Sequence, residues 1–261
     1  MIEKKIEEIN FLKSQISALK TDKDWDDSFL EKVKIDFTYN SNKIEGITLS
    51  YGQTVKLLKD FVTPQNAAPG ELLNLINHQK VLDNVFKSYH AESFSEENIK
   101  AIHKELMKDI AQWADDGDYS PGRYKLFENY TTRSNGKIHS YSPPAEVPAA
   151  MAELISNINL KLADIDIQDV EKHPLTIATF FHQEFLNKIH PFSDGNGRVG
   201  RLFTNLILLK QGYPPIFIKD VDRLEYLKRF EQSDADIKPM IDLLADRLVE
   251  SLTMKLEFIK K

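Results

Sequence analysis

The segment from His190 to Arg201 reads His-Pro-Phe-Ser-Asp-Gly-Asn-Gly-Arg-Val-Gly-Arg and gathers the side chains that could do chemistry. His190 is a candidate general base, because an imidazole exchanges protons near neutral pH. Asp194 can supply an oxygen ligand to Mg²⁺, which takes one or two protein carboxylates when it is bound to phosphates. Arg198 and Arg201 can face the same side of a helix and bind phosphate there. Together these residues predict a site for a magnesium nucleotide with a base beside it.

The turn Asp-Gly-Asn-Gly within this segment adds backbone donors to the side chains. Gly195 and Gly197 can adopt backbone conformations that are closed to most residues. Consecutive N–H groups can then point into one concavity, which suits an anion. Because a helix opens directly after the turn, its free N–H groups and the positive end of its dipole add to the attraction. The turn therefore predicts a phosphate-binding nest.

Two apolar helical stretches should hold this segment in place. Upstream, an apolar residue recurs every four positions, at Ile177, Phe181, Phe185 and Ile189. Pro191 disfavours helical geometry at the residue before it, so the first helix should end with the imidazole of His190 at its terminus. Downstream, a second apolar helix face is formed by Leu202, Phe203, Leu206 and Ile207. The spacing thus predicts helices over 174–189 and 197–211.

Helical periodicity also dominates the rest of the chain, so the sequence predicts a mainly α protein. The other expected helices span 2–20, 27–46, 51–62, 71–89, 95–110, 145–163, 222–232 and 237–258. Gly46 is a candidate left-handed cap for the second of them. Ser134-Asn135-Gly136 is a typical hairpin turn, and its flanks at 128–133 and 137–141 predict a short two-stranded ribbon.

A break at 64–70 predicts two parts, an N-terminal helical lobe over 1–69 and a catalytic core with C-terminal helices over 70–261. The 261 residues are enough to bury a core without covalent staples.

Composition weighs against several functional classes. The formal net charge is −6 and no long run of Lys or Arg occurs, whereas a nucleic-acid binder usually carries a basic patch. The chain has no cysteine, which excludes disulfides, thiolate metal sites and a cysteine nucleophile. No stretch has the apolar core of a signal peptide or the length of a membrane span. We expect a cytoplasmic protein that binds neither nucleic acid nor membrane.

The segment 190–201 resembles the motif of the Fic family, H-P-F-x-D/E-G-N-G-R-x-x-R, at every specified position. The resemblance covers about 70–250. Pro121 to Tyr124, the hairpin and the prolines at 143 and 148 resemble the family's flap region, while Tyr226-Leu227 and Pro239 resemble its closing helices. It implies a Fic-fold helical bundle with one short β-hairpin flap.

The resemblance also implies an activity: a protein adenylyltransferase that moves AMP from Mg-ATP to a hydroxyl of a target protein. His190 would remove the proton from that hydroxyl, and Asp194 would hold Mg²⁺ between the α- and β-phosphates. Phe192 would be a core anchor. The nucleotide-binding residues would be Gly195, Asn196, Gly197, Arg198 and Arg201, with Arg201 on the γ-phosphate.

Two further sites follow from the same resemblance. The hairpin would pair with an extended target segment by strand addition, through Lys137, Ile138 and His139. Tyr226 and Leu227 are predicted to line the adenine pocket, although an aromatic residue at helical spacing more often belongs to a core.

Ser41-Asn42-Lys43-Ile44-Glu45-Gly46 resembles the family's inhibitory motif, S/T-x-x-x-E-G/N. If Gly46 ends the helix, Glu45 lies in the last turn, where a negative charge is unfavourable and gains from a cationic partner. In the family that partner is the second arginine of the motif, here Arg201. The chain is therefore expected to inhibit itself through Glu45 and Ser41.

Several alternatives stay open. The chain could remove AMP with the help of Glu45, or transfer a different phosphate-containing group. It could be a nucleotide-binding regulator without activity, although a sensor has no need of His190. A DNA-binding regulator is disfavoured by the acidic charge balance. The sequence does not specify the target, for which the chain itself is a candidate. It also does not specify whether the chain associates into an oligomer.

Overall fold

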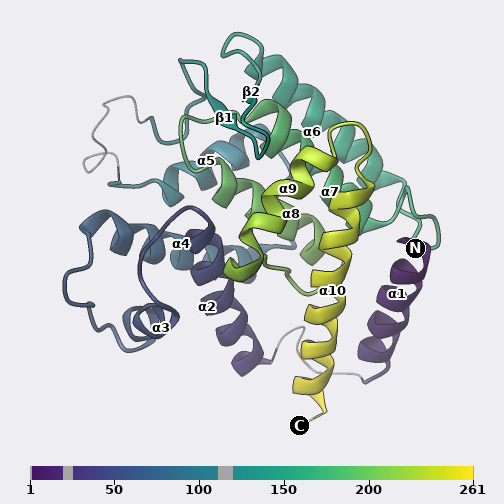
Figure 1. Ribbon diagram of the computed structural model, residues 1–261. Coiled ribbons are helices and arrows are strands. Elements are labelled where there is room, and N and C mark those ends of the chain that lie inside the picture. Colours follow the sequence, from purple (N-terminus) through teal and green to yellow (C-terminus); the bar gives the residue numbers. More distant parts are fainter. Residues whose placement is uncertain (1, 20–25, 111–119, 261) are drawn as a thin grey trace.

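The computed structural model describes residues 2–19, 26–110 and 120–260, which form a helical bundle with one short two-stranded sheet (Figure 1). The first helices are α1 (Ile2–Ala18), α2 (Asp27–Ile44), α3 (Tyr51–Lys59), α4 (Pro69–Ser88) and α5 (Glu96–Leu106). The later ones are α6 (Val147–Ala163), α7 (Pro174–Gln183), α8 (Asn196–Lys210), α9 (Arg223–Gln232) and α10 (Lys238–Ile259). The predicted mainly α fold is confirmed.

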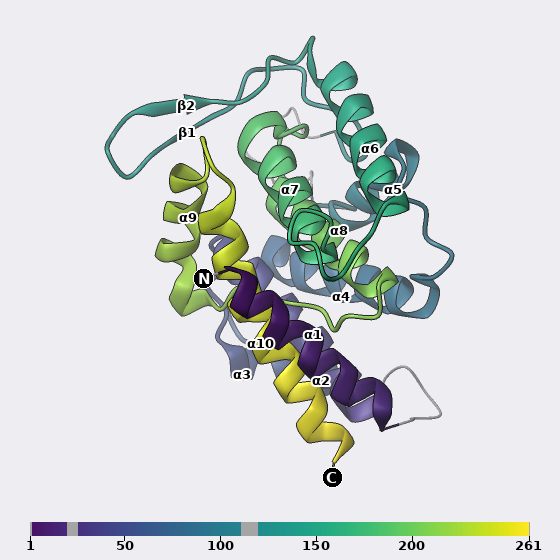
Figure 2. The same cartoon turned by 90° about the vertical axis from the view of Figure 1, so that its right-hand side faces the viewer.

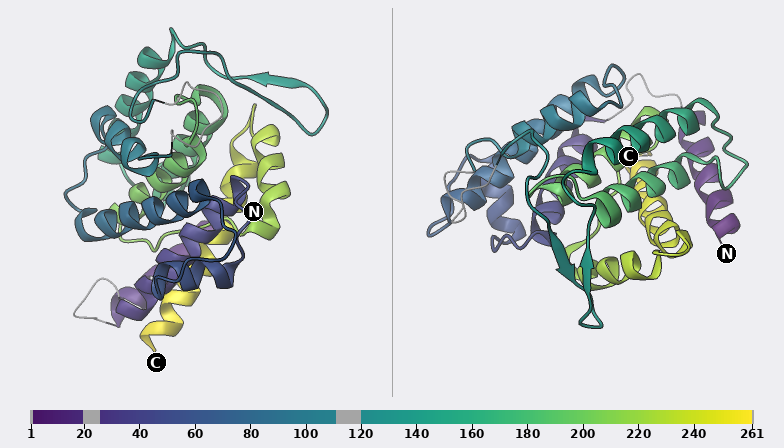
Figure 3. Two further views of the ribbon diagram at one scale, coloured as in Figure 1. Left: turned by 90° about the vertical axis from the view of Figure 1, so that its left-hand side faces the viewer. Right: turned by 90° about the horizontal axis from the view of Figure 1, so that it is seen from above.

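The hairpin is the sheet of β1 (Tyr130–Thr132) and β2 (Ile138–Ser140). The strands are antiparallel, with Thr131 opposite His139, as the turn at 134–136 predicts. Figures 2 and 3 show that the hairpin leaves the body of the bundle and reaches over α9.

The buried core surrounds α7 and α8, and every described residue of α8 from Arg198 to Leu209 is buried. The main hydrophobic cluster joins Ile6 of α1 and Phe37 of α2 to Leu206 of α8 and Leu248 of α10. In Figure 2, α1 lies along α10. Helices α1 and α2 therefore pack into the same core as the rest, whereas α3 packs on Leu75 of α4 in a separate small cluster. The boundary at residue 69 stays a prediction.

Several element boundaries differ from the sequence prediction, and α5, expected to reach residue 110, ends at Leu106. Helix α3 ends at Lys59, and Phe61 has a φ of 56°. Helix α4 begins at Pro69, inside the expected break, because proline suits the first turn of a helix where no N–H partner is needed. The predicted helix 174–189 is α7 followed by a π-helix, η2 (Glu184–Ile189).

Two helix ends carry clear caps, and the first of them was predicted. Gly46 has a φ of 100°, as expected of a left-handed residue after α2. The Ser95 hydroxyl accepts the N–H of Asn98 at 3.2 Å and caps α5. In the described parts of the chain, no helix has both the length and the apolar character needed to cross a bilayer.

Candidate active site

His190 closes η2 in a left-handed conformation, with φ 49° and ψ 63°. Its backbone N–H donates to the Phe185 carbonyl at 2.9 Å, a spacing typical of a π-helix. Its Nδ1 lies 2.9 Å from the Leu186 carbonyl oxygen. Because a carbonyl only accepts, Nδ1 carries the proton and Nε2 keeps the lone pair. The imidazole is therefore held in the tautomer that a general base needs.

The surroundings of His190 keep it neutral. Its ring stacks on Tyr141, with centroids 4.0 Å apart and planes at 15°. Burial, assisted by the positive charge of Lys125, lowers the pKa of His190 to about 4. The base form is therefore present throughout the neutral range.

Lys125 and Asn129 fix the loop that carries His190. The buried Lys125 ammonium donates to the Asn129 amide oxygen at 2.5 Å and to the Ile189 carbonyl at 3.3 Å. The Asn129 amide nitrogen in turn lies 3.4 Å from the His190 carbonyl and 3.2 Å from that of Phe192. Neither residue was predicted to be functional. Lys125 directly follows the predicted flap segment 121–124, and Asn129 lies in the predicted strand 128–133.

His103 of α5 fixes the other end of the loop. Its Nδ1 accepts the Gly122 N–H at 2.8 Å, so its Nε2 must carry the proton that is donated to the Asp194 carbonyl at 3.0 Å. The ring lies parallel to Phe192 with centroids 3.7 Å apart. Phe192 is fully buried, which agrees with its expected role as a core anchor. His103 was missed because a lone histidine at helical spacing gives no signal.

The glycine turn opens α8 as expected. Gly195 has a φ of 77°, and a Cβ there would lie only 2.7 Å from the Met107 sulfur. The Asn196 side chain is buried and bonds back to the Phe192 backbone, accepting its N–H at 2.9 Å and donating to its carbonyl at 2.7 Å. The amide side chain of Asn196 therefore closes the turn, and its backbone begins the helix.

Asp194 is one of the carboxylates that line the cavity. Its Oδ1 accepts the Gly195 N–H at 2.5 Å, and its Oδ2 lies 3.7 Å from an Arg198 nitrogen. Its side chain is 49% exposed. Within the described ranges, no three His, Cys, Asp or Glu residues come together to hold a metal ion. A single accessible carboxylate fits Mg²⁺ that is held mainly by phosphates and water.

The two motif arginines point to different neighbours. The buried Arg198 donates to the Asn74 amide oxygen on α4. The buried Arg201 donates through Nε to the Ser41 hydroxyl at 3.0 Å and through Nη2 to the Ser41 carbonyl at 2.8 Å. Arg201 Nη2 also lies 2.5 Å from Glu45 Oε1. The structure thus brings together the three residues predicted to form the inhibitory contact.

Glu45 lies where α8 begins. A Cβ on Gly197 would collide with the Glu45 carboxylate, so only a glycine leaves room for it. Burial opposes the charge of Arg201, but Glu45 and Tyr226 outweigh it, and the pKa of Arg201 is raised above its ordinary value.

His190, Asp194 and Arg201 line one cavity of about 250 Å³. Its walls include Glu45, Tyr141, His190, Asp194, Asn196, Gly197, Arg201, Arg223, Tyr226 and Leu227. Arg223 was not predicted; its Nε donates to the Ile44 carbonyl at 2.8 Å, directly beside Glu45. Tyr226 is 1% exposed and belongs to the core, as expected of an aromatic residue at helical spacing, and it also forms part of the cavity wall. The adenine pocket itself stays a prediction.

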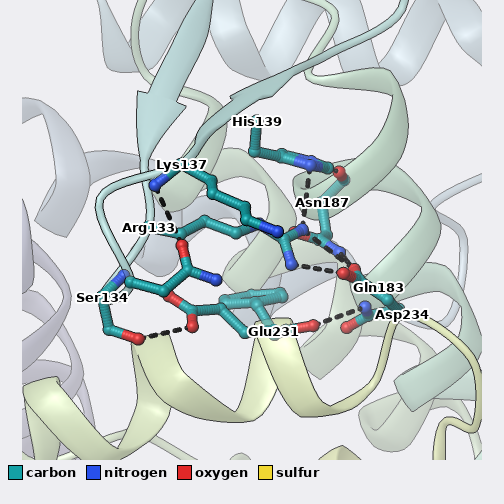
Figure 4. Close-up of polar contacts among 10 residues, drawn as sticks. Arg133, Ser134, Lys137, His139, Gln183, Asn187, Glu231 and Asp234 are labelled. Atoms are coloured by element: carbon teal, nitrogen blue, oxygen red, sulfur yellow. Dashed lines mark hydrogen bonds and ion pairs between the residues drawn. The ribbon is translucent and has the colours of Figure 1, made fainter.

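The hairpin is tied to α9 at one end of the cavity (Figure 4). Arg133 pairs with Asp234, and Ser134 bonds to Glu231 through both its N–H at 2.7 Å and its hydroxyl at 2.6 Å. His139 points inward and lies 2.6 Å from the Asn187 carbonyl.

The three residues predicted for the flap therefore separate. His139 contacts the protein, Ile138 is 68% exposed, and Lys137 is also exposed. Their contact with a target stays a prediction.

Comparisons with known proteins agree with this geometry. The model of the Fic/DOC family matches residues 93–208. A protein adenylyltransferase Fic from Nematostella vectensis is 30% identical over 79% of this chain and 45% of its own length. A protein of the same name from Aedes aegypti is 28% identical over 85% of this chain and 42% of its own length. The chain thus spans less than half the length of these curated relatives.

Two solved structures share the fold. A Fic domain containing signaling protein from Bacteroides thetaiotaomicron superposes with a TM-score of 0.86 at 30% identity, over 97% of both chains. Fic-1 from C. elegans superposes with a TM-score of 0.81 at 22% identity, over 99% of this chain and 73% of the other, and shows the fold alone. The first match covers nearly the whole of both chains, and it confirms what the motif at 190–201 predicts: the chain belongs to the Fic/DOC family.

Proposed function

We propose that this chain transfers AMP from Mg-ATP to a hydroxyl side chain of a protein. The observation that carries the proposal is the state of His190, whose Nε2 keeps its lone pair while its ring lines the cavity shared with Asp194 and the start of α8. The name of the relatives, protein adenylyltransferase Fic, supports the same reaction.

In the proposed reaction the target oxygen attacks the α-phosphorus of ATP, its proton passes to His190 Nε2, and pyrophosphate leaves. The backbone N–H groups of residues 195–197 and the guanidinium of Arg201 stabilise the charge that develops on the phosphates. Asp194 would hold Mg²⁺, which would supply positive charge to neutralise the phosphates of ATP. The remaining work of the protein is to hold the reactants in place.

We further propose that Glu45 inhibits the transfer. An Arg201 paired with Glu45 at 2.5 Å has less capacity to bind a γ-phosphate. The carboxylate also lies against Gly197 at the positive end of α8, where it would repel the phosphates that this helix end attracts.

The test is to incubate the full chain with Mg²⁺ and ATP, labelled in one sample at the α-phosphate and in another at the γ-phosphate. Wild type, Glu45→Gly, and Glu45→Gly with His190→Ala are compared for label on protein. Label from the α-position alone, strong in Glu45→Gly and lost in the double variant, is the expected result. Label from the γ-position would mean phosphoryl transfer instead. ATP binding without label in any variant, with candidate target proteins added, would contradict AMP transfer.

A second candidate is removal of AMP from a modified protein. The side chain of Glu45 is 33% exposed and lines the cavity, so its carboxylate could orient a water molecule toward an AMP ester. Protein that Glu45→Gly has labelled with AMP is then incubated with wild type. Release of AMP by wild type but not by Glu45→Gly would establish this activity.

A further inference from the structure

A chain of buried polar groups ends on Arg201. The Tyr226 hydroxyl lies 2.8 Å from His182 Nε2, and Tyr226 lines the same cavity as Arg201, with which it interacts electrostatically. His182 Nδ1 lies 2.8 Å from the Thr204 hydroxyl, which donates to the Gly200 carbonyl at 2.7 Å. These residues come from α7, α8 and α9, and the transfer mechanism uses none of them except Arg201.

The direction of each hydrogen bond follows from the two ends of the chain. The Gly200 carbonyl can only accept, so the Thr204 hydroxyl gives its proton there and accepts from His182 Nδ1. His182 Nε2 then has a lone pair and accepts the proton of the Tyr226 hydroxyl. The Tyr226 oxygen therefore keeps lone pairs that attract the Arg201 guanidinium, which can only donate. Every member of the chain is satisfied in one arrangement.

This arrangement does not change near neutral pH. Burial lowers the pKa of His182 to about 3 and raises the pKa of Tyr226 to about 12. Both groups are also almost fully buried, at 1% exposure each, and pack against each other and against the ring of Phe230. The Tyr226 oxygen is therefore a fixed, neutral acceptor.

Arg201 consequently has two sets of contacts of different kinds. From α2 it receives the Glu45 carboxylate and the Ser41 oxygens. From α9 it receives the Tyr226 hydroxyl. The first set includes the proposed inhibitor, while the second leaves the cationic charge of Arg201 uncompensated and available to an anion.

We propose that Tyr226 is a positioning residue that keeps Arg201 directed into the cavity once Glu45 no longer holds it. The inference rests on the proposed function, in which Arg201 binds the γ-phosphate of ATP. A tyrosine without its hydroxyl would leave the guanidinium free to turn away. ATP should lose affinity while ADP, which has no γ-phosphate, should not.

The chain offers a matched control. Tyr213 is also fully buried, and its hydroxyl lies 3.1 Å from Nε2 of the buried His173. Neither residue is part of the cavity wall. Tyr213→Phe therefore removes the same hydroxyl from the same kind of pair without touching Arg201.

The experiment measures Mg-ATP and Mg-ADP binding by calorimetry to the full chain carrying Glu45→Gly and His190→Ala, so that no transfer takes place. Adding Tyr226→Phe should weaken ATP binding about tenfold, as expected when one polar contact with a charged group is lost, and leave ADP binding unchanged. Thr204→Val should weaken ATP selectively by a smaller factor, because it acts through His182. Tyr213→Phe should alter neither nucleotide.

Two results would overturn the inference: unchanged ATP binding in Tyr226→Phe, or equal weakening of ATP and ADP. If the parent protein itself does not bind ATP more tightly than ADP, the role of Arg201 on the γ-phosphate fails and Tyr226 fails with it. If the parent discriminates and Tyr226→Phe discriminates equally, only the role of Tyr226 fails.

Discussion

His190 and Arg201 line one cavity but are held in different ways. His190 is fixed by its own loop: its imidazole bonds to the Leu186 carbonyl, and the loop carbonyls bond to Lys125 and Asn129. Arg201 instead pairs with Glu45, a carboxylate on α2 that precedes it by 156 residues.

The difference separates the contacts that hold the proposed base from the contact that is proposed to inhibit transfer. Contacts within one loop and its neighbours keep the base in place whenever the core is folded. The contact between α8 and the end of α2 can be removed through the Glu45 side chain alone, because that side chain is 33% exposed and lies outside the hydrophobic core. We therefore expect changes around His190 to abolish transfer, and changes at the α2 end to increase it.

The largest effect is expected from His190→Ala in the Glu45→Gly background. Loss of a general base typically lowers a rate by about 10²–10⁴-fold, because the target hydroxyl is left without a proton acceptor. Single-turnover transfer of α-labelled AMP measures the change. Nucleotide affinity should be nearly unchanged in this variant, and transfer at the parent rate would exclude His190 as the base.

The next largest effect is an increase of transfer in Glu45→Gly, on the order of 10-fold to 100-fold, the usual range of coupling between a regulatory contact and a site. Ser41→Ala should give a smaller increase, because the Ser41 backbone carbonyl still accepts from Arg201 at 2.8 Å. Initial rates of labelling in the two variants and in wild type test the order. An increase in Ser41→Ala that equals the one in Glu45→Gly would shift the control from the carboxylate to the helix end as a whole.

Both sides of the cavity should be sensitive to acid, because buried histidines lie near Arg201 as well as near His190. Burial lowers the pKa values of His103 and His190 to about 4, and that of His182 to about 3. An unfolded histidine takes up a proton near pH 6.5, while these stay neutral in the folded state to lower pH.

The unfolded chain therefore binds more protons in that window, and the free energy of unfolding should fall as the pH drops from about 6.5 toward 4. The slope is about 1.4 kcal/mol per pH unit for each such histidine. Urea unfolding at a series of pH values measures it. In His103→Gln the slope should decrease by about 1.4 kcal/mol per pH unit, the contribution of one histidine. An unchanged slope would contradict the lowered pKa of His103.

The same contrast explains what the sequence could and could not predict. The motif at 190–201 lies in one continuous segment, so its residue types alone indicated a base, a carboxylate and an anion-binding turn. The contact of Ser41 and Glu45 with Arg201 was expected only from family resemblance, because no local rule joins residues that far apart. The supporting groups His103, Lys125 and Asn129 act through tertiary hydrogen bonds that leave no pattern in the sequence.

Local rules also missed two backbone features. Pro191 indicated that a helix ends at His190, but not that the last turn is a π-helix or that His190 is left-handed. Both depend on the packing of η2 against α8, where Gly200 leaves room for the Leu186 side chain.

The smallest effect is expected at the ion pair between Arg133 of the hairpin and Asp234, which follows the end of α9. Arg133 pairs with Asp234, whose side chain is 46% exposed, and a pair of this kind contributes only about 0.2–1 kcal/mol. Because Arg133 also lines the cavity and donates to His139 Nδ1 at 2.9 Å, Arg133→Gln should raise the Kd for ATP, by no more than about fivefold. The increase should shrink at high salt, which already screens the pair in wild type.

Lys238→Gln breaks an exposed pair with Asp236 outside the cavity and serves as the control. If both variants change ATP binding equally, the ion pair of Arg133 and Asp234 has no specific part in holding that end of the cavity, and the contrast between a fixed base and a movable arginine would not extend to the hairpin.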